Sequence, residues 1–225
     1  MRQTIAGIAI PDSSLARAAT ELVRDSESDL LYHHSRRVFL WAALTGQRCE
    51  LAFDAELLYV GALFHDMGLV PKYASTSERF EVDGANAARN CLAAWAVPES
   101  DVDQVWDAIA LHTTPGIPKH KKPVVALVTS GVEMDVLGLA FDEFTHDQRQ
   151  QVAAVHPRQE NFKEAIIDAF AEGTRYKPET TLGNVKADVL ALKDPSYRRL
   201  NFCSLILGSA WNDHAQAGGC SACAV

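Results

Sequence analysis

The sequence predicts an all-α fold organised as a single domain. Apolar residues recur at spacings of three and four along most of the 225 residues, whereas no segment keeps the two-residue alternation of an amphipathic strand. Hydrophobic residues make up 48% of the chain and charged residues 22%, which is typical of a globular protein whose core needs no disulfide bonds. We therefore expect one helical bundle over residues 1–214, followed by a flexible tail over 215–225.

Capping residues and helix breakers divide the chain into predicted helices. A Ser or Asp side chain at a helix start accepts a hydrogen bond from an unpaired N–H group, and Gly or Pro ends a helix. The segments that start at Ser or Asp are 13 or 14 to 26, 28 or 29 to 46, and 54–68, the last two closed by Gly46 and Gly68. The segments bounded by Pro or Gly are 82–96, 100–113 and 123–137. Weaker apolar periodicity predicts helices over 147–155, 161–172 and 202–211.

The net charge of −8 argues against partners that carry many phosphates. An acidic surface repels nucleic acid and anionic membranes, and no apolar run reaches the roughly 18 residues of a membrane-spanning helix. The basic run at 119–122 is interpreted as a solvated loop, with the lip of an anion-facing pocket as the alternative. We expect a small-molecule substrate, no nucleic acid and no membrane, with a homo-oligomer left open.

The five cysteines favour a reducing, cytoplasmic location. Their odd number and the lack of a secretory apolar segment at the N-terminus both point that way. Cys49, Cys91 and Cys203 lie in predicted helices, where a free cysteine is expected to be a small buried residue. Cys220 and Cys223 form a lone C-x-x-C pair, which is interpreted as an incidental feature of the tail.

Five ionisable residues lie on the apolar faces of predicted helices: His34, His65, Asp66, His112 and Asp135. A buried carboxylate without a partner is unstable, so such a group neutralises, pairs with a cation or binds a metal. Imidazole nitrogen and carboxylate oxygen together suit Zn²⁺, Fe²⁺ or Mn²⁺. The pattern predicts one buried site for a divalent transition metal.

Three ordered motifs carry a resemblance to a known family. HSRRV begins at His34, ALFHDMG contains His65 and Asp66, and Asp135 follows on a later helix. This set resembles the HD-domain superfamily of helical metalloenzymes, and the resemblance implies those four residues as metal ligands. His33 is the alternative to His34, which is preferred because Ser35 follows it as in the family pattern.

A closer resemblance extends over most of the chain. The stretches IPDSSLARAA, HSRRVFLWAAL, AELLYVGALFHDMGL, RFEVDGANAAR and WDAIALHTTPGIP are similar to the cyanamide hydratase-like branch of that superfamily. The resemblance implies addition of water to the nitrile of cyanamide to give urea, with a single metal, zinc in preference to iron or manganese. Phe80 stands where two-metal members carry a further His ligand, which argues for one metal.

The expected chemistry assigns roles to two more residues. A bound metal lowers the pKa of water toward 7, and attack of that water on a nitrile leaves a nitrogen that needs a proton. His112 is the expected proton donor, and Glu81 is the second candidate. The alternatives are that His112 orients a ligand carboxylate, and that Glu81 is an exposed residue at a helix start.

A tiny uncharged substrate calls for a small, closed, apolar pocket. The residues expected to line it are Phe64, Phe80, Thr113 and Ile117. An HD-type phosphohydrolase acting on a nucleotide or small phosphate ester is the alternative function, and it would need Arg or Lys directed inward. A non-catalytic, metal-stabilised module that binds a ligand is the third hypothesis.

Overall fold

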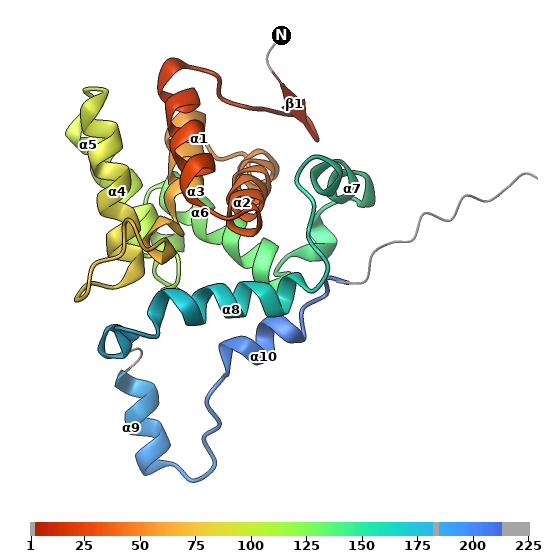
Figure 1. Ribbon diagram of the computed structural model, residues 1–225. Helices are drawn as coiled ribbons and strands as arrows, with labels where there is room; N and C mark the ends of the chain where they lie inside the picture. The colour runs from red at the N-terminus through yellow and green to blue at the C-terminus, as the bar shows by residue number, and fades with distance from the viewer. Residues whose placement is uncertain (1–2, 182–184, 213–225) are drawn as a thin grey trace, which may run out of the picture.

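The computed structural model describes residues 3–181 and 185–212, and helices make up most of this range (Figure 1). The elements in chain order are β1 (Thr4–Ile5), β2 (Ile8–Ala9), α1 (Ser14–Ser26), α2 (Asp29–Arg48), α3 (Ala55–Phe64), η1 (Met67–Leu69), α4 (Phe80–Ala94), α5 (Glu99–Ala110), η2 (Pro118–His120), α6 (Pro123–Val132), η3 (Glu133–Leu137), η4 (Phe141–Glu143), α7 (His146–Val155), α8 (Phe162–Thr174), η5 (Pro178–Thr181), α9 (Val185–Lys193) and α10 (Phe202–Leu207). The strands β1 and β2 pair as a short antiparallel hairpin. The predicted all-α class is confirmed.

The first three helices begin at the predicted capping residues. Ser13 caps α1 and Ser28 caps α2, so the structure selects the earlier residue in each of the two open alternatives. The Asp54 side chain caps α3 by accepting hydrogen bonds from the N–H groups of Glu56 and Leu57. These caps are local interactions, which is why sequence alone places them.

The central helix is α2, which packs against α3 and α6 (Figure 1). Every residue from His34 to Gly46 is buried, so this helix has no solvent-facing stripe over that length. Gly46 does not end the helix, as predicted, because α2 continues to Arg48. The glycine instead allows contact with Phe53, whose ring lies where a Cβ atom at position 46 would be.

The helix α3 ends at Phe64, four residues before the predicted end at Gly68. Gly68 belongs to η1, and the backbone carbonyl of Phe80 occupies the space that a Cβ atom at position 68 would need. Gly84 of α4 approaches the carbonyl oxygens of Phe64 and His65 in the same way. The two glycines therefore bring α4 into backbone contact with the turn that carries His65.

The predicted helix 123–137 is divided into α6 and the π-helix η3. It ends at Gly138, which has φ of 68°, a left-handed conformation suited to glycine. The wider π turn begins at Glu133 and contains Asp135, which is fully buried. A π turn inside a helical run often accompanies a functional residue.

The helices α8 and α10 form a second apolar cluster below the bundle (Figure 1). Phe162 and Ile166 of α8 are buried together with Ile206 of α10. The helix α10 ends at Leu207, short of the predicted 211. The helix α9 was not predicted, and its Leu192 is 79% exposed, so it lacks the buried face that periodicity detects.

The free cysteines differ from their prediction. Cys49 and Cys203 are exposed and Cys91 is half-buried, because Cys49 follows the last turn of α2 and Cys203 lies in the exposed first turn of α10. Cys220, Cys223 and the predicted tail lie outside the described residues.

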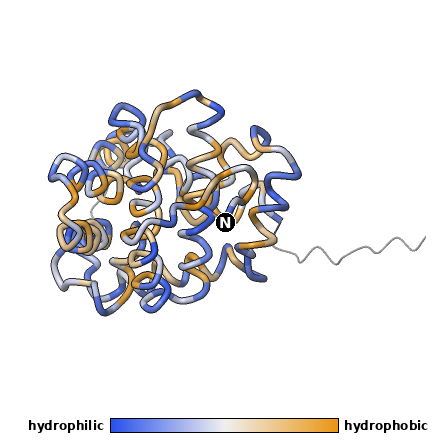
Figure 2. The backbone as a smooth tube through the Cα atoms, turned by 90° about the horizontal axis from the view of Figure 1, so that it is seen from above, coloured by the Kyte–Doolittle hydropathy of each residue, from blue (hydrophilic) through white to orange (hydrophobic). Residues whose placement is uncertain are grey.

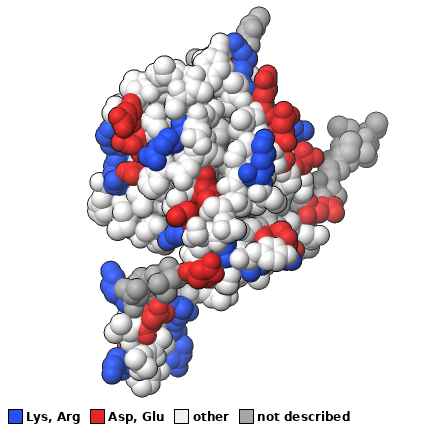
Figure 3. All heavy atoms as spheres, turned by 60° about the vertical axis from the view of Figure 1, so that its left-hand side comes forward, with Lys and Arg blue, Asp and Glu red and all other residues white. Residues whose placement is uncertain are grey.

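The surface is mixed in both hydropathy and charge. Figure 2 shows apolar and polar stretches alternating along the helices, and Figure 3 shows Lys and Arg interspersed with Asp and Glu on one face. In the described residues, every helix is too short or too polar to cross a membrane.

Candidate metal centre

The ends of three helices meet at a buried cluster of imidazole and carboxylate groups. His34 comes from the second turn of α2, His65 and Asp66 follow the last residue of α3, and His112 follows α5. His34, His65 and Asp66 have no exposed surface, and His112 is 3% exposed. The prediction that these four ionisable residues point into the core is therefore confirmed.

Three of these side chains converge with the spacing of metal ligands. Nε2 of His34 lies 3.1 Å from Nε2 of His65, and Oδ2 of Asp66 lies 3.6 Å and 3.3 Å from those two atoms. Ligands at about 2.0–2.1 Å from a tetrahedral ion are separated by about 3.3 Å. The three residues could thus hold a metal ion.

The protonation of the rings supports this interpretation. Nδ1 of His65 lies 2.8 Å from the carbonyl oxygen of Ala62, and Nδ1 of His34 lies 2.7 Å from Asp135 Oδ2. Because a carbonyl or carboxylate only accepts, each Nδ1 carries a hydrogen. When both rings are neutral, their Nε2 atoms present lone pairs to each other at 3.1 Å, an arrangement that either a metal ion or a proton on His65 stabilises.

Asp66 supplies the second indication that the residues fit a metal. Both of its oxygens are buried and lack a hydrogen-bond partner in the described residues. Burial opposes ionisation of Asp66, but the imidazoles of His65, His34 and His112 hold its pKa below the usual range. An ionised carboxylate with unsatisfied oxygens is what a cation site requires.

The imidazole pKa values follow the same electrostatics. Burial opposes the charged form of His65, but the Asp66 carboxylate outweighs burial and raises the pKa of His65. Burial lowers the pKa of His34 despite its contact with Asp135. Burial, assisted by the nearby His65, lowers the pKa of His112 to about 4, so this ring is neutral at pH 7.

The structure places Asp135 behind His34 rather than among the converging atoms. Its Oδ2 accepts hydrogen bonds from Nδ1 of His34 at 2.7 Å and Nη2 of Arg37 at 2.9 Å. Its Oδ1 accepts from Nε of Arg37 at 2.8 Å and from Nε1 of Trp41 at 3.0 Å. The predicted fourth ligand is thus positioned to orient His34, and the three-residue set leaves coordination positions open.

His112 faces the same cluster from the opposite side. Its Nδ1 donates to the carbonyl oxygen of Ile109 at 2.7 Å, and its Nε2 lies 3.8 Å from Oδ1 of Asp66. That Nε2 is buried and has no hydrogen-bond partner in the described part of the chain. His112 therefore presents an unprotonated nitrogen toward Asp66.

The choice between neighbouring histidines favours His34. Nδ1 of His33 lies 3.1 Å from Nδ1 of His156, and this pair is separate from the three converging residues. Adjacent residues on a helix differ in direction by about 100°, so only one of the two can face the site.

Glu81 is neither exposed nor free. Its carboxylate accepts hydrogen bonds from Arg79 Nη2 at 2.6 Å and from the Thr113 hydroxyl, and it is 4% exposed. Burial opposes its ionisation, but the bonds from Arg79 and Thr113 lower the pKa of Glu81 overall. The exposed helix-start alternative is wrong, and Glu81 ties the loop after α5 to the start of α4.

The residues predicted to line the substrate pocket differ in burial and in distance from the cluster. The Phe80 ring packs edge-on against His112 with centroids 5.6 Å apart, and Phe64 is fully buried. Ile117 is 50% exposed, so it does not belong to the buried shell around the site. Apolar character alone did not indicate this exposure, and the role of Ile117 in a substrate pocket stays a prediction.

The aromatic cover that α8 supplies was not predicted from the sequence. The Phe162 ring lies 6.0 Å from the His34 ring, and the Phe170 ring lies 5.4 Å from that of Phe80. The spacing of Phe162, Ile166 and Phe170 by four residues was a usable signal of an apolar face. It did not reveal which part of the bundle that face covers.

A comparison with protein-family models matches residues 31–175 to the HD domain. The chain belongs to the HD-domain family. The matched region contains all the residues of the metal centre and the covering helix α8. HD domains are metal-dependent enzymes, mostly hydrolases, which agrees with the buried His34, His65 and Asp66 cluster. No curated protein matched the chain.

Proposed function

We propose that this HD-domain protein adds water to a small uncharged substrate, with the nitrile of cyanamide as substrate and urea as product. The observation that carries the proposal is the enclosure of the centre. His34, His65 and Asp66 have no exposed surface, the Phe162 ring of α8 lies beside His34, and the Phe80 ring of α4 lies beside His112. A substrate must shed its hydration to reach them, which is far easier for a neutral nitrile than for a phosphate dianion.

The charges around the site support the same choice. Three cations that contact site residues or their neighbours already have carboxylate partners: Arg37 with Asp135, Arg79 with Glu81, and Lys177 with Asp83. Phosphate recognition relies on Arg or Lys donors directed at the phosphate oxygens. The resemblance to the cyanamide hydratase-like branch is a further, independent support.

The ligands define what a metal would contribute. When held by His34, His65 and Asp66, a divalent transition metal lowers the pKa of water and so supplies a nucleophile near neutral pH. Zinc suits two imidazoles and one carboxylate with open positions, and iron or manganese are the alternatives. Asp135 keeps Nδ1 of His34 protonated and thereby directs Nε2 to the site.

His112 is placed to move the proton of the reaction. At neutral pH its Nε2 is an acceptor, because the ring is neutral and its hydrogen lies on Nδ1. It takes a proton from the attacking water as the water oxygen bonds to the nitrile carbon. It returns that proton to the nitrile nitrogen, and tautomerisation completes urea. In this proposal His112 accepts a proton before it donates one, whereas the sequence suggested only the role of proton donor.

The experiment is a urea assay on cyanamide with metal-supplemented protein. The His112→Ala variant should retain the metal and lose about 10²- to 10⁴-fold in kcat, the range for a lost general acid or base. The His65→Ala variant should lose both metal and activity. The exposed His120 provides the matched control, since His120→Ala should change neither. Full activity in His112→Ala would contradict the proton-transfer role.

The family match favours one alternative, a phosphohydrolase acting on a nucleotide or small phosphate ester. The same assay samples should therefore be tested for phosphate release from a panel of nucleotides. Phosphate release without urea formation would replace nitrile hydration with phosphate-ester hydrolysis. A filled metal site with neither activity would support a ligand-binding module instead.

A further inference from the structure

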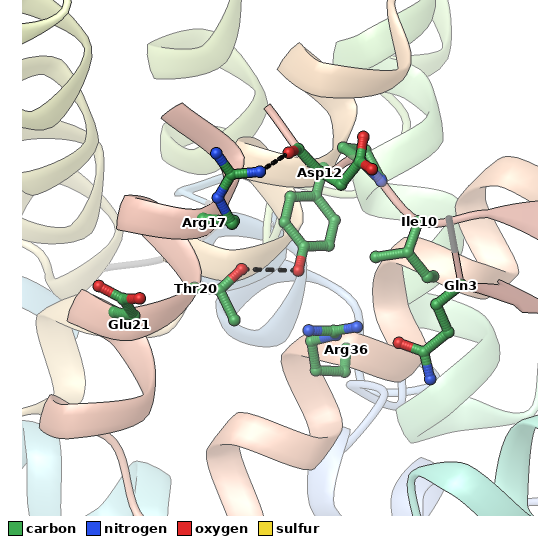
Figure 4. Close-up of a pocket in the computed structure, with 9 residues that line it drawn as sticks. Gln3, Ile10, Asp12, Arg17, Thr20, Glu21 and Arg36 are labelled. Carbon is green, nitrogen blue, oxygen red and sulfur yellow. Dashed lines mark hydrogen bonds between the residues drawn. The ribbon is translucent and has the colours of Figure 1, made fainter. Parts of the chain in front are cut away.

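A pocket of about 240 Å³ lies away from the metal residues, where the N-terminal segment crosses α1, α2 and α3 (Figure 4). Ile10 and Pro11 line it from the segment before α1, Thr20 from α1, Arg36 from α2 and Tyr59 from α3. The metal centre uses none of these side chains.

In the part of the chain that the structure describes, the guanidinium of Arg36 at this pocket is buried without a counter-charge. Arg36 is 6% exposed, its Nη1 donates to the Tyr32 hydroxyl at 3.3 Å, and it lies over the rings of Tyr59 and Tyr32. Its Nε is buried with no hydrogen-bond partner, and among the described residues no carboxylate oxygen is within 4.0 Å of its nitrogens. Burying a cation in this way is unfavourable unless an anion joins it.

The hydroxyl groups at the pocket define what else a ligand meets. The Thr20 hydroxyl donates to the carbonyl oxygen of Ala16 at 2.7 Å, so the 2.8 Å contact between Thr20 and Tyr59 has the Tyr59 hydroxyl as donor. The hydrogens of both hydroxyls are therefore used. The Tyr59 oxygen keeps a lone pair, which can accept a hydrogen bond from a ligand.

We propose that this pocket binds a small organic carboxylate that also carries a hydrogen-bond donor, as in a hydroxy acid. The carboxylate pairs with Arg36, whose planar guanidinium matches its two oxygens. The donor group of the ligand bonds to the Tyr59 oxygen. Ile10, Pro11 and the Tyr59 ring supply apolar walls for the carbon skeleton.

The remaining charges disfavour a phosphate dianion in the same place. Asp12 and Glu21 also line the pocket, and their carboxylates oppose a second negative charge. Arg17 is partly committed, since it donates to the Asp12 carbonyl oxygen and to the Ser14 hydroxyl. Recognition of an anion therefore rests mainly on Arg36, which favours a single carboxylate.

The test is calorimetric titration of the full chain with lactate, propionate and inorganic phosphate. Lactate should bind more tightly than propionate, which lacks the hydroxyl, and phosphate should bind least. Arg36→Gln should weaken lactate binding by at least about tenfold. Arg24→Gln is the matched control, because Arg24 also lies over the Tyr32 ring but does not line the pocket, and it should leave binding unchanged.

Tyr59→Phe is the second variant, which keeps Arg36 and the ring and removes only the hydroxyl. Its affinity for lactate should fall to that for propionate, and lactate should raise the melting temperature of the wild type but not of Arg36→Gln. Lactate binding that is equal in wild type and Arg36→Gln, no binding by the wild type, or tighter binding of phosphate would each overturn the proposal.

Discussion

Arg36 and Arg37 are neighbours in α2, both buried, yet their surroundings are opposite. Arg37 makes two hydrogen bonds to Asp135, and its Nη1 donates to the carbonyl oxygen of Pro157 at 2.8 Å. Among the described residues, Arg36 contacts a tyrosine hydroxyl and two aromatic rings and no carboxylate. A helix turns by about 100° per residue, so consecutive side chains enter different interfaces. Burial of a charged side chain therefore indicates a role only when the groups that contact it are known.

The side of α2 that carries Arg37 and the side that carries Arg36 therefore have different roles. On the Arg37 side, Asp135 is ionised: burial opposes ionisation, but Arg37 and Arg158 hold its pKa well below the usual range. That carboxylate in turn holds His34 toward the metal centre. On the Arg36 side, the uncompensated cation is available to a ligand.

The largest expected effect on stability comes from removing the ion pair between Arg37 and Asp135. Arg37→Gln leaves Asp135 buried without its main counter-charge, so we expect a loss of about 3–5 kcal/mol in the free energy of unfolding. Urea unfolding in the presence of a chelator measures this without a contribution from metal. A loss of less than about 1 kcal/mol would mean that the Arg37–Asp135 pair is dispensable and would remove the contrast with Arg36.

The next effect concerns the metal rather than the fold. Asp135→Asn keeps an acceptor near Nδ1 of His34 but removes the charge, and changes of this kind lower metal affinity by about 10- to 100-fold. Zinc titration against a competing chelator measures the change, with His120→Ala as an unaffected control. Complete loss of metal, equal to that in His65→Ala, would instead make Asp135 a ligand, as the family resemblance implies.

A smaller effect of opposite sign is expected at Arg36. Arg36→Gln removes an uncompensated buried cation, so the ligand-free protein should be as stable as the wild type or more stable by up to about 1 kcal/mol. The same urea unfolding experiment measures it. A destabilisation as large as that of Arg37→Gln would show that Arg36 is already satisfied in the folded chain.

The smallest effect is the pH dependence of the free energy of unfolding that His156 contributes. Burial, and then the charges of Arg36, His33 and Arg37, lower the pKa of His156 to about 3. The unfolded chain, with an ordinary histidine pKa near 6.5, therefore binds the proton first, and His156 costs stability as the pH falls through about 6.5 toward 3. Between pH 7 and 6 this amounts to about 0.7 kcal/mol.

The measurement compares the free energy of unfolding at pH 7 and pH 6 in the wild type and in His156→Gln. The variant should lose this part of the pH dependence. An identical pH dependence in wild type and His156→Gln would place the titration elsewhere.

Local patterns predicted much of the helical framework. Asp54 was predicted as a cap, and Ser13 and Ser28 were each one of two candidates, because the capping bond involves only residues within a few positions. The predicted helix ends at Gly46 and Gly68 are wrong, because these glycines make room for Phe53 and Phe80, which lie outside the helix concerned. A helix end depends on tertiary contacts wherever the glycine is required for close packing rather than for its own backbone conformation.

The candidate site also has features that local sequence predicted and features that depend on helix packing. The inward direction of His34, Asp66 and His112 followed from helical periodicity, since a side chain in register with apolar neighbours is buried with them. Periodicity specifies a face but not the element that packs against it. The approach of the π turn to α2, which brings Asp135 to the outer nitrogen of His34, and the cover of Phe162 both arise from helix packing. Local sequence therefore predicted which side chains face inward as candidate ligands. The position of Asp135 behind His34, and the lack of a carboxylate beside Arg36 in the described residues, follow instead from distances across helix interfaces, which no one-dimensional pattern contains.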